Sequence, residues 1–199
     1  MTVHVLSSTQ FFNLLRRRTK RNAAAVDRRI EASGLREMAV LMSDSSGFSR
    51  KTKEYGILQF LAVMTQCYDR LVPIIEKRHG TCLSLGADNI LAVFEDPADA
   101  VAAAADMHRR LKKRNRGRGD ADRFNICIGI HYGRLVRLRD NAYGDTVNIA
   151  AKIGEDLAAK DEILVTRAVA DRVRDRFRCA YSRSTEIGGR TFELCRVRY

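Results

Sequence analysis

One ten-residue stretch limits the possible folds more than any other, and it reads Val40-Leu41-Met42-Ser43-Asp44-Ser45-Ser46-Gly47-Phe48-Ser49. Its apolar run predicts a strand, Gly47 predicts a tight turn, and the residues that follow predict a helix. The free N–H groups and positive dipole end of a helix favour a phosphate, and Asp44 is placed to bind a divalent cation beside it. Because Mg²⁺ is usually held by one or two carboxylates and by phosphate oxygens, a second carboxylate is expected nearby.

That second carboxylate is Asp88, which lies between two short apolar runs that predict a β-hairpin. Further along, a glycine opens another predicted helix, on which Asn148 and Lys152 are four residues apart and so share one face. Each position also has a structural interpretation. Asp44 alone could stabilise a helix N-terminus, and Asp88 alone could be a turn residue.

Taken in order, three motifs carry a family resemblance: D-x-x-G-F-S at Asp44, G-x-D-N-x-L-A-V-F around Asp88, and Y-G-D-T-V-N-x-A-x-K ending at Lys152. Together they resemble the class III nucleotidyl cyclase catalytic domain over roughly Met38 to Tyr199. The resemblance implies a ferredoxin-like α+β fold, with a mostly antiparallel sheet and helices packed on it. We therefore expect an N-terminal helical extension over residues 1–36 and a catalytic domain over residues 37–199.

The apolar periodicity predicts the elements in more detail. A single helix over Ser49 to Arg78 is expected, with Pro73 kinking its last part, and a second helix over Pro97 to Arg114. The expected later elements are strands over Phe124–Tyr132 and Arg134–Leu138, a helix over Gly144–Leu157, a strand over Ile163–Val165, a short helix over Ala168–Arg174 and a final hairpin across Gly188-Gly189.

The resemblance also implies a mechanism. Asp44, Asp88 and the backbone carbonyl of Ser45 would hold two Mn²⁺ or Mg²⁺ ions per site, which assist attack of the ribose 3′-hydroxyl on the α-phosphate. Asn148 matches the asparagine that orients the ribose. Lys152 stands where the family has an arginine, so the charge is kept but the bidentate fork is lost.

In the family these groups come from two chains, which implies a homodimer with two composite active sites. One chain supplies the aspartates and the other supplies the positions of Asn148 and Lys152. Gly47 and Phe48 are expected beside the substrate, although Phe48 is also a candidate core anchor.

The positions that select the base depart from the family pattern. Counting from the motifs gives Ser84 and Asn141 where adenylyl cyclases have lysine and aspartate. An amide both donates and accepts, which suits the N3–H and O4 of uracil. The chain therefore resembles the pyrimidine cyclases of Pycsar antiphage systems, with UTP favoured over CTP, cyclic UMP as the second messenger, and a separate effector that this product activates. A register slip of one residue would place Asp140 at the reader position instead.

Composition narrows the remaining classes. The net charge of +12 gathers in residues 16–21 and 109–118, without the interleaved aromatic residues of a stacking platform, so no nucleic acid partner is expected. An apolar run long enough to span a bilayer is missing, and the five scattered cysteines suggest a reduced, cytoplasmic protein with no membrane partner. The alternatives are a CTP cyclase, an adenylyl or guanylyl cyclase with atypical base contacts, and a catalytically silent nucleotide-binding regulatory dimer.

Overall fold

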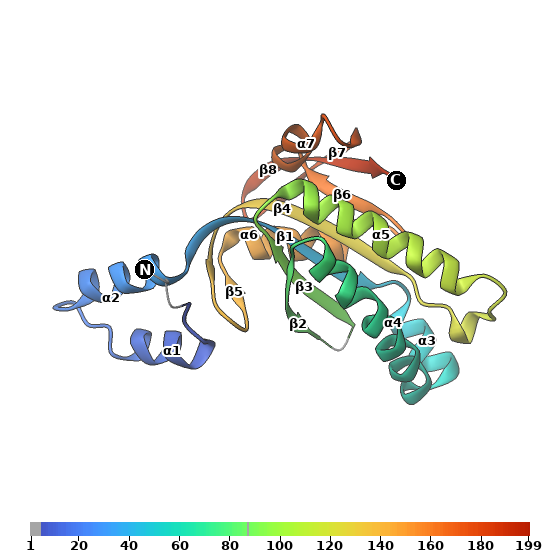
Figure 1. Cartoon of the computed structure of the whole chain (residues 1–199), viewed down its shortest axis with the longest axis horizontal. Coiled ribbons are helices and arrows are strands. Elements are labelled where there is room, and N and C mark those ends of the chain that lie inside the picture. The colour runs from blue at the N-terminus through green and yellow to red at the C-terminus, as the bar shows by residue number, and fades with distance from the viewer. Residues whose placement is uncertain (1–4, 87) are drawn as a thin grey trace.

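The strand that carries Asp44 is an interior strand of one eight-stranded sheet (Figure 1). The computed structural model describes residues 5–86 and 88–199. The strands are β1 Leu35–Ser45, β2 Thr81–Leu85, β3 Asn89–Phe94, β4 Ile126–Arg137, β5 Ala142–Tyr143, β6 Ile163–Thr166, β7 Arg178–Ile187 and β8 Arg190–Arg198. Their order is β2-β3-β1-β4-β6-β8-β7, and β5 pairs with β4 outside this path. Since β4 and β6 form the only parallel pair among them, the sheet is mostly antiparallel, and the predicted α+β class is confirmed.

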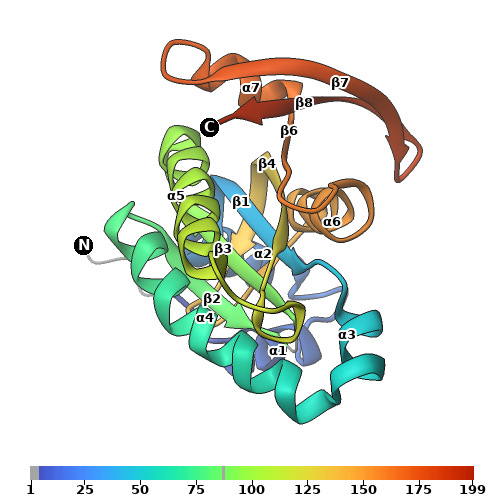
Figure 2. The same cartoon turned by 90° about the vertical axis from the view of Figure 1, so that its right-hand side faces the viewer.

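The helices cover both faces of this sheet. They are α1 Ser8–Arg16, α2 Ala23–Gly34, α3 Phe48–Tyr55, α4 Ile57–Lys77, α5 Pro97–Asn115, α6 Asp145–Ala151 and α7 Arg167–Val173, with a 3₁₀ turn η1 Asp120–Asp122 and a π-helical segment η2 Lys152–Leu157. Figure 2 shows α4 and α5 on one side of β1 and α6 on the other. None of the helices in the described part of the chain combines the length and apolarity needed to cross a bilayer.

Burial on both faces explains why β1 is a nearly continuous apolar run. Ala39 and Leu41 belong to the core beneath α4 and α5, whereas Met38, Val40 and Met42 belong to the core on the α6 side. Alternate residues of a strand point to opposite faces, so each layer of helices packs on its own set of β1 side chains. The last residues of β1 are thereby held rigidly.

Two predicted boundaries were wrong. The helix expected over Ser49–Arg78 is divided at Gly56, whose φ of 86° lies in the left-handed region that glycine adopts readily. Pro73, by contrast, lies inside an uninterrupted α4. The two strands expected over Phe124–Tyr132 and Arg134–Leu138 form the single strand β4, because Gly133 continues the ladder.

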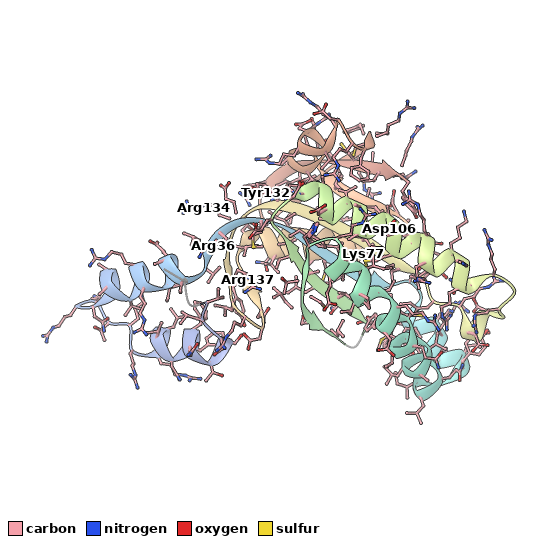
Figure 3. All side chains as sticks on the ribbon, in the orientation of Figure 1. Arg36, Lys77, Asp106, Tyr132, Arg134 and Arg137 are labelled. Atoms are coloured by element: carbon pink, nitrogen blue, oxygen red, sulfur yellow. The ribbon has the colours of Figure 1, made fainter. Side chains whose placement is uncertain are left out.

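Ion pairs tie the two long helices together on the outside. Arg78, just after α4, donates two hydrogen bonds to Asp106 of α5, at 2.9 and 2.6 Å, and Arg109 donates to the other oxygen of the same carboxylate. Figure 3 labels Asp106 on α5 and Lys77 near the end of α4. The basic runs 16–21 and 109–118 are largely exposed, which agrees with solvated faces.

Candidate active site

Asp44 lies at the C-terminal end of β1, between two neighbouring strands. It pairs with Asn89 of β3 on one side and with Cys127 of β4 on the other. The chain then turns through Gly47, whose φ is 88°, directly into α3. The predicted strand, turn and helix start are confirmed, and they place Asp44 four residues before the first residue of α3.

Several carboxylates act on Asp44. Burial raises the pKa of Asp44 to about 6, the negative charges of Asp88, Glu155 and Asp156 add to this shift, and the Ser45 backbone N–H opposes it. Burial also raises the pKa of Glu155, with contributions from Asp156 and Asp88. Mutual repulsion of this kind shows that negative charge gathers around Asp44, and in the described part of the chain only Asp156 of these carboxylates forms a salt bridge, with Lys152. A divalent cation would relieve that repulsion, so the residues present fit the Mg²⁺ or Mn²⁺ that the resemblance implies.

The number of protein ligands is small. Within residues 5–86 and 88–199, no group of three His, Cys, Asp or Glu side chains is arranged to hold a metal. Asp88 lies in the turn between β2 and β3, next to Ala87, which falls outside the described residues. If Asp44, Asp88 and a backbone carbonyl were the protein ligands, coordination positions would be left for phosphate oxygens, as is usual for Mg²⁺ in phosphoryl-transfer sites.

Glu155 was missed by the sequence analysis. It is brought close by two facing glycines: a Cβ added at Gly129 of β4 would lie 2.3 Å from the backbone nitrogen of Gly154 in η2, so no larger residue fits. This close approach lets η2 cross β1 and β4, and Asn89 Nδ2 donates to Glu155 Oε1 at 3.4 Å. The only local signal was a glycine followed by two acidic residues.

Asn148 and Lys152 lie on the helix that follows β5. Asn148 is exposed on α6, and Lys152 begins η2, where its Nζ lies 2.8 Å from Asp156 Oδ2. Among the described residues, no hydrogen bond or ion pair joins either side chain to Asp44 or Asp88. The structure therefore brings the carboxylates together and leaves Asn148 available on the surface.

Phe48 and Gly47 differ in how closely they are packed. The Phe48 ring packs edge to face on Phe60 with 5.0 Å between centroids, so its side chain anchors the start of α3 in the core. Nothing lies within 4 Å of the position of a Cβ at Gly47, which leaves the backbone of the turn open. The Phe48 ring therefore serves packing, and the turn at Gly47 has no neighbour on its Cβ side.

The two expected base readers lie on separate hairpins. Ser84 is exposed near the end of β2, beside a bulge. Asn141 lies in the turn between β4 and β5, where its Oδ1 accepts from the Ala142 N–H at 2.8 Å and its Nδ2 donates to the Tyr143 hydroxyl at 3.1 Å. The neighbouring Asp140 carboxylate accepts instead from the backbone N–H and hydroxyl of Ser8, at 2.8 and 2.9 Å. Asp140 is thus engaged with the N-terminal segment.

Comparison with known proteins agrees with this geometry. Residues 30–195 match the family described as the adenylate and guanylate cyclase catalytic domain. The structure superposes on the guanylyl cyclase Cya2 with a TM-score of 0.74 and 21% identity, covering 82% of this chain and 93% of that one. For the adenylyl cyclase CyaB from P. aeruginosa the TM-score is 0.72 and the identity 20%, with 83% and 95% covered. At this identity the likeness shows the fold alone.

Curated relatives are longer than this chain. The serine/threonine-protein kinase pkn2 of Myxococcus xanthus is 26% identical over 133 residues, which are 66% of this chain and 16% of that protein. Adenylate cyclase 1 of Rhizobium meliloti is 24% identical over 162 residues, which are 72% of this chain and 24% of that protein. The chain thus spans less than a quarter of the length of each. With its motifs, its fold and its match over residues 30–195, it belongs to the adenylate and guanylate cyclase catalytic domain family.

Proposed function

We propose that this chain converts a nucleoside triphosphate, with UTP favoured, into its 3′,5′-cyclic monophosphate and pyrophosphate. The observation that carries the proposal is the cluster of repelling carboxylates around Asp44, located where β1 turns into α3. A cluster of this kind favours a divalent cation, and the adjacent helix N-terminus favours a phosphate. Nucleotide cyclisation needs both at one point.

Each residue has a defined part in this reaction. Asp44, Asp88 and the Ser45 carbonyl would hold the metal ions. These ions, when bound, acidify the 3′-hydroxyl and neutralise charge on the phosphates. The open backbone at Gly47 would bind phosphate oxygens. Asn148 would orient the ribose and Lys152 would stabilise negative charge on the phosphate, once Lys152 exchanges its Asp156 partner for the substrate.

Base selection would depend on Asn141. The backbone N–H of Ala142 fixes which end of the amide is the acceptor, and each end keeps one further hydrogen-bonding position. A free donor and a free acceptor side by side pair with O4 and N3–H of uracil. Cytosine presents a donor at N4 and an acceptor at N3, so it pairs with the same amide less favourably without a carboxylate.

The assembly and the cellular role belong to the same proposal. Two chains would form a homodimer with composite sites, residues 1–36 would form an extension to the catalytic domain of residues 37–199, and the cyclic product would act as a second messenger on a separate effector in antiphage defence. The names of the relatives support the alternative of an adenylyl or guanylyl cyclase with atypical base contacts.

The first experiment incubates the purified full chain with Mn²⁺ and each of ATP, GTP, CTP and UTP, and identifies cyclic products by mass spectrometry. Cyclic UMP as the main product is the expected result. Cyclic AMP or cyclic GMP as the main product would overturn the assignment of Asn141 while keeping the cyclase reaction.

Asp44→Ala and Asp88→Ala test the reaction itself, and both should lower product formation at least roughly 100-fold because a metal ligand is lost. Asp175→Ala is the matched control, since its side chain is 92% exposed and lies beyond α7. A catalytically silent regulatory dimer would be indicated if the unmodified chain bound nucleotide but formed no product with any of the four.

A further inference from the structure

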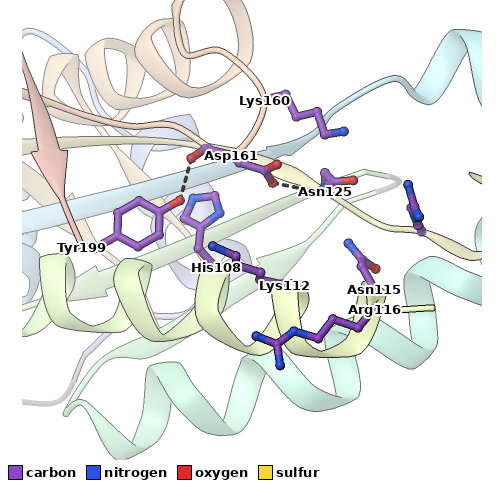
Figure 4. Close-up of a pocket in the computed structure, with 9 residues that line it drawn as sticks. His108, Lys112, Asn115, Arg116, Asn125, Lys160, Asp161 and Tyr199 are labelled. Carbon is purple, nitrogen blue, oxygen red and sulfur yellow. Dashed lines mark hydrogen bonds between the residues drawn. The ribbon is translucent and has the colours of Figure 1, made fainter. Parts of the chain in front are cut away.

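A cavity that Asp44 does not line lies between the C-terminal half of α5 and the segments that lead into β4 and β6 (Figure 4). Its volume is about 490 Å³. Four cationic side chains line it: Lys112, Arg116, Arg123 and Lys160. Asp161 has the only acidic side chain among the described lining residues, so the side chains that line the cavity carry a net charge of about +3.

These cations have no carboxylate partners. Among the residues that the structure describes, none of the four takes part in a salt bridge. The Asp161 carboxylate accepts from a neutral partner, Asn125 Nδ2, at 2.8 Å, and the Asp161 backbone carbonyl accepts from the Tyr199 hydroxyl at 2.6 Å. The positive charge of the cavity lining is therefore not balanced by salt bridges among the described residues, and an anion from solution could balance it.

The floor of the cavity holds a buried histidine. His108 is 4% exposed, and within the described part of the chain neither ring nitrogen makes a hydrogen bond of standard geometry, although the Glu162 backbone lies close enough to act on the ring. Its ring face stacks on Tyr199, with 5.1 Å between centroids and 21° between planes. Burial lowers the pKa of His108 to about 4, so the ring is neutral and carries one N–H donor at pH 7. An unsatisfied buried donor is costly unless something binds to it.

The spacing along the sequence places His108 on the same helix face as two of the cationic residues. His108, Lys112 and Arg116 recur every four residues along α5 and just past its end, so they share one face. Lys160 and Asp161 approach from the loop before β6 on the other side (Figure 4).

We propose that this cavity binds a small anion carrying two or more phosphate groups. One phosphate oxygen would accept from the His108 ring, and the lysine and arginine groups would surround the rest. A single phosphate group carries a charge of about −2 at most and would leave part of the positive lining unmatched. Cationic side chains project into the cavity from α5 and from the loop before β6. An anion with two or more linked phosphate groups could contact both sets at once.

The test titrates inorganic pyrophosphate into the full chain by calorimetry, with EDTA present so that no divalent metal binds at Asp44. One site per chain is expected. The double variant Lys112→Gln, Lys160→Gln should bind at least about tenfold more weakly, because two charge-assisted contacts are removed. Lys113→Gln is the matched control: it removes the same charge one residue along α5, from a side chain that does not line this cavity.

Asp44→Asn separates this cavity from the metal site. The two are near, since the Asn125 carbonyl accepts from the Ser46 N–H at 2.9 Å, but the Asp44 carboxylate takes no part in the cavity. Unchanged pyrophosphate affinity in Asp44→Asn is therefore expected. The ring signals of His108 in the nuclear magnetic resonance spectrum should shift on titration, which is a measurement independent of any variant.

A parallel titration with ATP in EDTA distinguishes the source of the phosphates. Equal affinity for ATP and pyrophosphate indicates that only the phosphate groups are bound, whereas tighter binding of ATP that still needs Lys112 and Lys160 indicates a nucleotide. The proposal is overturned if pyrophosphate does not bind, if the double variant binds as well as Lys113→Gln, or if the His108 signals stay unchanged.

Discussion

At the scale of single residues, His108 makes the stability of the fold depend on pH. Its folded pKa of about 4 is below the value of roughly 6.5 expected when unfolded, so the stability is fully present above pH 6.5 and is lost as pH falls toward 4. The expected loss between pH 7 and pH 5 is about 2 kcal/mol in the free energy of unfolding. His131, with its pKa also lowered by burial to about 4, acts in the same direction, whereas Asp44 opposes it.

His108→Phe isolates this contribution, because phenylalanine keeps an aromatic ring against Tyr199 but does not titrate. In urea unfolding at pH 7 and pH 5, the unmodified chain should lose about 2 kcal/mol more than His108→Phe between the two conditions. Equal losses in both proteins would mean that His108 is protonated to the same extent when folded as when unfolded.

Gly154 is the residue on which the position of Glu155 depends. An added Cβ would lie 2.5 Å from the Met42 carbonyl oxygen and 3.1 Å from the Gly129 nitrogen, both on the backbone. Gly154→Ala should therefore lower the free energy of unfolding by about 1–3 kcal/mol. Gly119→Ala is the control, since nothing lies within 4 Å of its Cβ position, and it should change stability by less than about 0.5 kcal/mol in the same urea titration. Similar effects of the two substitutions would contradict this account.

At the scale of elements, α1 packs against the hairpin that carries Asn141. Phe11 stacks on Tyr143 with 5.7 Å between centroids, and the Tyr143 hydroxyl accepts from the Asn141 amide. If Asn141 selects the base, Phe11→Ala should lower the ratio of kcat/KM for UTP to kcat/KM for CTP several-fold, because Tyr143 would no longer be held in place beside Asn141. The ratio is the informative measurement, because a smaller folded fraction lowers both values equally.

Leu15→Ala is the matched control for Phe11→Ala, since Leu15 lies on the same helix, is 36% exposed and is outside the cluster around Phe11. It should leave the ratio unchanged. A ratio that is the same in Phe11→Ala as in the unmodified chain would show that α1 has no part in base selection.

Local patterns predicted most elements, and tertiary packing accounts for the rest. The Asp44 strand, the Asp88 hairpin and the last hairpin each follow from their own residues. Gly56 was overlooked because the apolar spacing continues across it into α4. Gly133 suggested a break in β4, but its missing side chain makes room for the Thr146 hydroxyl, which lies 2.8 Å from the Cβ position. Glu155 could not be predicted, because its place depends on the crossing of η2 over β1 and β4.

At the scale of the whole molecule, the question is whether the aspartates and Asn148 of one active site belong to the same chain or to two chains. Asp44 and Glu155 interact within one chain, whereas the exposed Asn148 makes no hydrogen bond or ion pair to Asp44 or Asp88 among the described residues. A surface asparagine on α6 suits a partner chain that supplies the carboxylates, and a two-fold dimer would then contain two such sites.

Mixing two inactive variants tests this arrangement. Asp44→Ala destroys one half of the composite site and Asn148→Ala destroys the other, so each homodimer should be inactive. A mixed dimer has one site with both defects and one intact site. If subunits exchange freely, an equal mixture contains about half mixed dimers and should recover about a quarter of the activity of the unmodified chain. Recovery should follow the rate of subunit exchange, and a mixture of Asp44→Ala with Asp88→Ala should recover nothing because both defects fall on the same half. Activity that stays absent in the first mixture would place all the catalytic groups within a single chain.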